Sequence, residues 1–138
     1  MKSRETLIRL KRFQVDEKRR QVMQIETMIA DLERMSAELE REIQSEERKA
    51  GISDPAHYAY PTYAKATRSR HDKLVASAND LKEKLEDAKA ELQDAFEDLK
   101  KVEILEDREK ASERAEIAAR EQAEMDRIGS RMRMHSRG

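Results

Sequence analysis

The residues that could support catalysis or metal binding are few and scattered. The three histidines, His57, His71 and His135, have no ligand spacing among them, and the chain contains no cysteine that could act as a nucleophile or bind a soft metal. The three glycines are isolated, so no glycine-rich loop could cradle a phosphate. We therefore expect no metal site and no cofactor.

Paired carboxylates are a second possible source of chemistry. Glu97 and Asp98 are adjacent, as are Glu46 and Glu47. The first pair falls outside the apolar stripe of an expected helix, and the second falls in the last turn of another. Acid–base catalysis needs a cleft that shifts pKa values and excludes water, and two paired helices offer none. We expect a protein that is not an enzyme.

Aromatic and basic side chains are better candidates, and they suggest binding. Tyr58, Tyr60 and Tyr63 lie within six residues of one another, beside His57. They could cap the end of a hydrophobic seam, or they could form an exposed patch for a partner, since aromatic side chains are favoured binding anchors. The sequence leaves both interpretations open.

Composition indicates what kind of scaffold carries these residues. Charged residues make up 43% of the 138 residues and aromatic residues only 4%. Such a chain cannot fill a compact globular core. Glycine (3) and proline (2) are scarce, while strong helix formers are abundant. This composition favours long helices that each bury one narrow apolar stripe.

A first helix is expected over residues 4–49, which contain neither Gly nor Pro. Its apolar residues follow a heptad repeat, which is typical of a coiled coil. Lys11 and Lys18 occupy the first two d positions, so the seam should be weakest near its start. One series recurs every seven residues at Ile8, Val15, Val22, Ile29, Ser36 and Ile43, and Ile25, Leu32 and Leu39 each follow a member by three.

Residues 50–65 are expected to connect this helix to the next. Gly51 suits the left-handed position that ends a helix, and Asp54-Pro55 resembles an N-cap followed by a first-turn proline. Pro61 would limit any helix that starts there to about one turn.

A second helix is expected over residues 66–128, followed by a short, basic, frayed tail over 129–138. After Val102 the seam positions become Glu106 and Glu109, and an apolar series begins in a new frame, which would turn the stripe. The heptad positions before that point are Leu74, Ala78, Leu81, Leu85, Ala88, Leu92, Ala95, Leu99 and Val102, and the new series is Ile104, Ala111, Ala118, Met125 and Met132.

A connector of this length favours intramolecular pairing of the two helices. The predicted fold is all-α: a single domain over residues 1–138 in which two long helices form a stalk-like antiparallel coiled-coil hairpin. Such a hairpin should be a monomer, and its second helix should extend past the first.

Charge is unevenly distributed, although the net charge is only −1. Residues 1–22 contain eight Lys or Arg and three acids, whereas residues 80–116 contain eight and fourteen. We expect the open end of the hairpin to be a basic tip suited to an acidic partner surface. The candidate partner-binding residues are Arg4, Arg9, Arg12, Arg19, Arg127 and Arg131, together with the three tyrosines.

Size, the segment from Lys2 to Phe13 and the connector from Gly51 to Tyr63 resemble one family, the FliJ proteins of flagellar type III export, in its alphaproteobacterial branch. The resemblance implies a non-enzymatic antiparallel coiled coil, similar to the central stalk of rotary ATPases. Such a protein would insert its open end into the hexameric export ATPase and promote its assembly and activity. The implied further partners are the membrane protein of the export gate and the escort chaperones of export substrates.

Two other functions remain open. A parallel structural spacer or dimerisation protein would sediment as a dimer, whereas the hairpin should be a monomer. A nucleic-acid-binding hairpin would show salt-sensitive binding, although no aromatic interleaving supports it and we expect no nucleic-acid partner. The charged N-terminus and the absence of a long apolar run predict a cytoplasmic protein without membrane insertion. The family resemblance implies that this protein associates peripherally with the membrane export apparatus.

Overall fold

The computed structural model describes residues 2–137, with side chains described for 3–135. Two helices account for nearly all of this range: α1, Lys2–Ala50, and α2, Thr62–Arg137. No strand occurs among residues 2–137. The chain divides into two units. Unit 1 combines the residues up to Arg12 with those from Glu97 onward, and unit 2 covers Phe13–Phe96.

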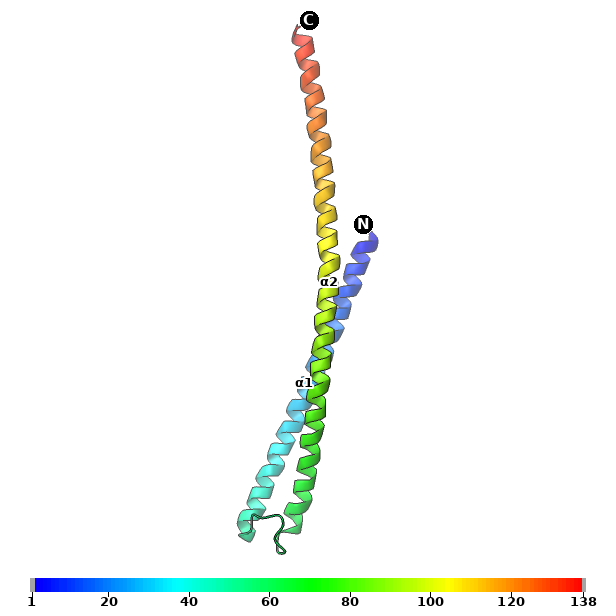
Figure 1. Cartoon of the computed structure of the whole chain (residues 1–138). Helices are drawn as coiled ribbons and strands as arrows, with labels where there is room; N and C mark the ends of the chain where they lie inside the picture. The colour runs from blue at the N-terminus through cyan, green and yellow to red at the C-terminus, as the bar shows by residue number, and fades with distance from the viewer. Residues whose placement is uncertain (1, 138) are drawn as a thin grey trace. The chain divides into compact units, whose positions relative to one another are not determined.

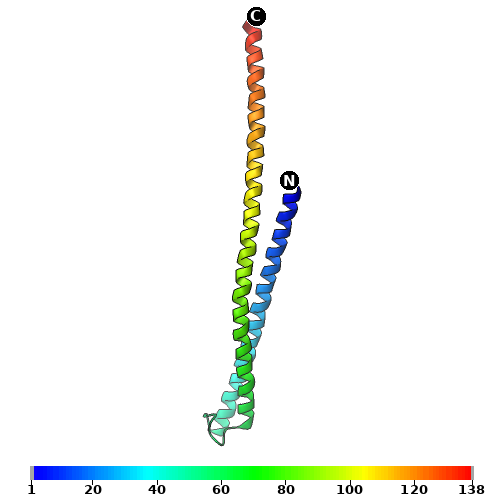
Figure 2. The same cartoon turned by 45° about the vertical axis from the view of Figure 1, so that its right-hand side comes forward.

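In unit 2, α1 and α2 lie side by side and antiparallel, joined by the connector (Figures 1 and 2). Two cross-helix ion pairs show the antiparallel order. Lys18 of α1 pairs with Glu91 of α2 at 3.0 Å, whereas Glu33, later in α1, pairs with Lys82, earlier in α2, at 2.9 Å. The predicted antiparallel hairpin is confirmed.

The hydrophobic core of unit 2 is the predicted heptad seam. From α1 the buried side chains are β-branched, and from α2 they are three alanines and Thr67, so that large residues of one helix pack against small residues of the other. The other predicted seam residues of unit 2 are half-buried. The buried apolar seam side chains are Val15, Val22, Ile29 and Ile43 from α1 and Ala64, Ala78 and Ala88 from α2.

Glycine ends α1 in the predicted way. Gly51 has φ +70°, its amide donates to Arg48 O at 3.3 Å, and the Ile52 amide donates to Glu47 O at 3.3 Å. These paired bonds form a Schellman motif, which satisfies carbonyls that the helix end would otherwise leave open. Asp54 then caps a turn, because its Oδ1 accepts from the Ala56 amide at 3.0 Å. No helical turn follows Pro55.

The bounds of α2 differ from the predicted 66–128. The helix begins directly after Pro61, whose carbonyl accepts from the Lys65 amide at 3.1 Å, so the connector is shorter than residues 50–65. At the other end α2 includes the expected tail and ends at Arg137. A single interior glycine, Gly129, costs about 1 kcal/mol relative to alanine, which the surrounding strong helix formers offset.

In unit 1, the start of α1 lies beside α2, and α2 then continues without a neighbour (Figure 1). The seam does not move to the new frame there. Glu106 is buried and Glu109 half-buried in the old frame, while Ile104 is 42% exposed and Met125 67%. Residues 110–128 of α2 are all exposed. The frame-shifted apolar series therefore faces solvent.

Candidate functional site

The three connector tyrosines have different environments. Tyr60 is 8% exposed, Tyr63 is 52% exposed and Tyr58 is 96% exposed. The Tyr63 hydroxyl donates to Glu42 at 3.3 Å, and the Tyr58 ring stacks on His57 at 4.6 Å. The sequence left capping and partner binding open for all three; burial favours capping for Tyr60 and an exposed contact for Tyr58.

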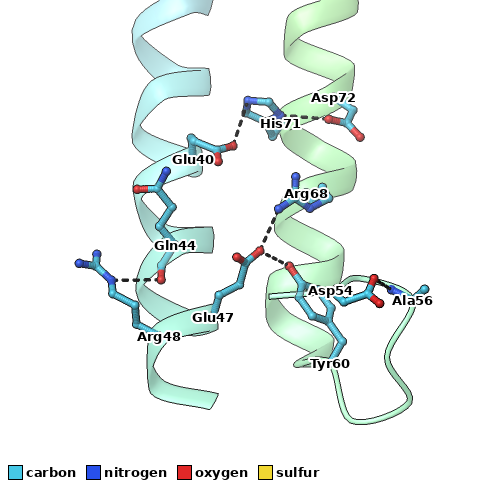
Figure 3. Close-up of polar contacts among 10 residues, drawn as sticks. All are labelled: Glu40, Gln44, Glu47, Arg48, Asp54, Ala56, Tyr60, Arg68, His71 and Asp72. Carbon is cyan, nitrogen blue, oxygen red and sulfur yellow. Dashed lines mark hydrogen bonds and ion pairs between the residues drawn. The ribbon is translucent and has the colours of Figure 1, made fainter. Parts of the chain in front are cut away.

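Tyr60 belongs to a polar cluster that joins the two helices beside the connector (Figure 3). Its hydroxyl donates to Glu47 Oε1 at 2.8 Å, and Arg68 Nη2 contacts the same oxygen at 2.9 Å. Burial, followed by the hydrogen bond to Glu47, raises the pKa of Tyr60. The hydrogen bond with Tyr60 is the main cause that raises the pKa of Arg68. The phenol therefore stays neutral and the guanidinium charged.

One turn further along α2, His71 extends this cluster. Its Nε2 lies 3.6 Å from Glu40 of α1, and its Nδ1 lies 3.0 Å from the neighbouring Asp72 (Figure 3). Two carboxylates and one imidazole could suggest a metal site. However, in the part of the chain that the structure describes, no group of three or more His, Cys, Asp or Glu side chains is arranged so that it could hold a metal ion. The cluster therefore fits a polar clamp between the helices.

Two of the predicted basic residues are engaged with acids of α2 in unit 1. Arg4 is half-buried and pairs with Glu109, and its Nη1 lies 3.8 Å from Glu106. Arg12 pairs with Glu103 at 3.3 Å. Arg9 is exposed and lines a shallow hollow with Glu106 and Lys110. Much of the positive charge at the start of α1 is thus compensated within unit 1.

The remaining predicted arginines lie on exposed surfaces. In unit 2, Arg19 pairs with Asp16 at 3.6 Å, and its guanidinium carbon lies 5.5 Å from the centre of the Phe96 ring. In unit 1, Arg127 pairs with Glu124 at 2.9 Å, and Arg131 is exposed.

A single basic tip does not form. Arg4 contacts α2 at Glu106 and Glu109, but Arg127 follows Glu109 by 127 − 109 = 18 residues. At about 1.5 Å per residue, the two arginines are separated by about 27 Å along the helix. The sequence predicts that the two termini bring their arginines together, but α1 stops pairing well before the arginines of α2. The basic surface is instead divided into two groups along unit 1.

Sequence reasoning missed Arg68, and it identified Glu47, His71, Glu106 and Glu109 without their partners on the other helix. Glu47, Arg68 and His71 belong to the clamp, while Glu106 and Glu109 meet Arg4. Their roles depend on which residue of one helix lies opposite which residue of the other. The heptad pattern identifies the seam of each helix but does not determine this register. These ion pairs could be predicted only by comparing the possible registers for the one that places opposite charges across from one another.

None of the described helices is both long and apolar enough to cross a bilayer. The model of one protein family, described as Flagellar FliJ protein, matches residues 5–138. Neither a curated protein nor a solved structure matched the chain. The family match covers both helices and the connector, which includes every residue of the clamp and all of the predicted binding residues except Arg4.

Proposed function

Because the chain belongs to the FliJ family and so has a role related to flagellar export, we propose that it is a stalk-like adaptor for the export ATPase. In this proposal the protein binds the hexameric ATPase and promotes its assembly and activity without catalysing a reaction itself. It acts at the cytoplasmic side of the export apparatus. The assignment of the connector to the alphaproteobacterial branch stays a prediction.

One observation carries this proposal: the exposed continuation of α2 in unit 1. Residues 110–128 have no buried position, and they present bulky apolar side chains to solvent. Ile117 is 53% exposed and Ile128 48% exposed, besides Met125. A partner that covers these apolar side chains would stabilise this segment, since most helical stability in proteins comes from tertiary packing. The lumen of a ring would supply that packing.

The gate membrane protein and the escort chaperones are proposed as further partners, and the connector is our candidate surface for them. Tyr58 is the best anchor there because it is almost fully exposed, whereas Tyr60 is buried and its hydroxyl donates to Glu47 in the clamp. Aromatic side chains bury large areas at low entropic cost when they bind. Tyr63 is a second candidate at intermediate exposure.

The proposal is tested by stimulation of the purified flagellar export ATPase. We expect Arg9→Glu, an exposed residue of unit 1, to raise the concentration needed for half-maximal stimulation by about tenfold, because opposing like charges across an interface is costly. The matched control is Arg41→Glu, which makes the same change at an exposed position of α1 in unit 2. We expect this control to stimulate like the unaltered protein.

Two outcomes would contradict the proposal at different levels. Equal stimulation by the Arg9→Glu variant and the unaltered protein would remove the basic surface of unit 1 from the mechanism. If the unaltered protein neither binds nor stimulates the ATPase, the adaptor function itself is wrong.

A further inference from the structure

The first turns of α1 bury little apolar surface. We call residues 3–12 of α1 the N-terminal arm. No side chain in this arm is buried, and its seam positions are Arg4, Ile8 and Lys11, all half-buried. Leu7 is 40% exposed and Leu10 50% exposed. The next seam residue along α1, Val15, is only 3% exposed. Apolar packing therefore holds the arm far less strongly than it holds the residues that follow.

Charge takes the place of apolar packing in the arm. Glu103, Glu106 and Glu109 are spaced by three residues on α2 and meet the two arginines described above. Glu106 is only 4% exposed, although it occupies a seam position, and its other oxygen lies 3.8 Å from Lys110. A buried carboxylate in a coiled-coil seam destabilises the pair relative to an apolar residue but favours one register.

Interactions of this kind respond to salt. Ion pairs between partly exposed groups contribute little individually and are screened when ionic strength rises. The end of a helix that loses its neighbour frays more readily, since most helical stability in proteins comes from tertiary packing. We infer that the N-terminal arm is an electrostatic latch, which opens from α2 and frays while the apolar seam beyond it stays paired.

Opening of the latch would change what α2 offers to a partner. The surface from Glu97 to Glu109, covered in part by the arm, would become continuous with the exposed residues that follow it in unit 1. This consequence rests on the proposed ATPase-binding function, whereas the latch itself does not. A closed latch would shorten the helix available for insertion, so the contact would act as an autoinhibitory one.

Hydrogen exchange of the full chain tests the latch. Between about 0.05 and 0.5 M NaCl, where screening lengths fall several-fold, we expect amide exchange in residues 5–12 to accelerate by about five- to tenfold. Exchange in residues 20–46 should change by less than about twofold, because apolar packing holds them. Equal acceleration of both segments, or none in the arm, would overturn the inference.

Two substitutions at one position should act in opposite directions. Glu106→Gln removes a charge that faces Arg4 and should accelerate exchange in the arm at low salt. Glu106→Leu completes the apolar seam and should slow exchange in the arm and weaken its salt dependence, to which the ion pairs of Glu103 and Glu109 still contribute. The matched control is Glu124→Gln, whose ion pair with Arg127 lies within α2 beyond the arm, and it should leave the arm unchanged.

The same variants separate the latch from the proposed function. If both hold, Glu106→Leu should lower ATPase stimulation and Glu106→Gln should raise it. If no protein stimulates the ATPase, the adaptor function fails, and the exchange data alone decide on the latch. Acceleration of the arm by Glu106→Leu would contradict the latch whatever the ATPase does.

Discussion

At the scale of single residues, Tyr60 differs from the other connector tyrosines because it is buried and hydrogen-bonded across the helix pair. Its hydroxyl and the Arg68 guanidinium share one carboxylate oxygen of Glu47. Such a shared acceptor joins the end of the connector to both helices. This arrangement makes Tyr60 part of the fold and leaves Tyr58 as the exposed candidate for the proposed partner contact.

The raised pKa of Tyr60 gives a prediction with a definite sign. The folded protein favours the neutral phenol, so this contribution to stability is complete below the ordinary tyrosine pKa of 10.0 and is lost as pH rises through the higher folded value. We expect Tyr60→Phe to lower the melting temperature at about pH 8. It should also reduce the further loss between about pH 8 and pH 11, compared with the unaltered protein.

Tyr58→Phe is the control for this measurement because Tyr58 is almost fully exposed. It should melt like the unaltered protein at both pH values, although lysines also deprotonate in that range. An identical pH response of the Tyr60→Phe variant and the control would show that the clamp does not hold the connector.

Residue roles were only partly predictable from the sequence. The three tyrosines were identified as a cluster, but their division into buried and exposed members depends on how the connector folds back onto the helices. The contact between Glu47 and Arg68 was missed for the same reason, since 21 residues separate them in the chain. Ion pairing of Arg4 and Arg12 was missed because it depends on the register between the helices.

At the scale of the elements, two glycines with opposite roles allow a paired test. Gly51 has a positive φ, and a Cβ there would meet no atom within 4 Å. Gly51→Ala should therefore destabilise the hairpin through backbone strain alone, by about 1–2 kcal/mol. Chemical denaturation monitored by circular dichroism measures this cost.

Gly129→Ala should have the opposite effect. Gly129 lies within α2 without a positive φ, and a Cβ there would lie 3.9 Å from Arg133, an ordinary contact. Alanine favours the helix by about 1 kcal/mol, so helicity at 222 nm should rise while the main unfolding transition stays unchanged. Stabilisation by Gly51→Ala would contradict the left-handed glycine at the end of α1. Destabilisation by Gly129→Ala would contradict the helical conformation of α2 at that residue.

The helices themselves were largely predictable. The heptad pattern identified the seam residues of both helices, and Gly51 marked the end of α1 correctly. The sequence predicts that α2 starts at residue 66, four residues later than observed, because Pro61 could limit a preceding helix, whereas it precedes the first turn of α2. The frame-shifted apolar series was identified, but the pattern does not show that it lacks a partner in unit 1.

At the scale of the whole molecule, the proposed adaptor function depends on a chain that pairs with itself as a monomer. The antiparallel fold was predictable because the connector is short and each helix has one apolar stripe. The register was not predictable, since heptads repeat and neighbouring registers bury similar residues. Cross-helix ion pairs such as that between Glu33 and Lys82 help to define the register of unit 2.

Crosslinking of this pair tests the central claim most directly, because the chain contains no native cysteine. The double variant Glu33→Cys and Lys82→Cys removes one surface ion pair. The loss should lower the free energy of unfolding by about 0.2–1 kcal/mol and leave the fold intact. Treatment with a short bismaleimide should give an internally linked monomer, while Glu33→Cys alone should give none. Linked dimers in place of that monomer would contradict the hairpin and the adaptor function built on it.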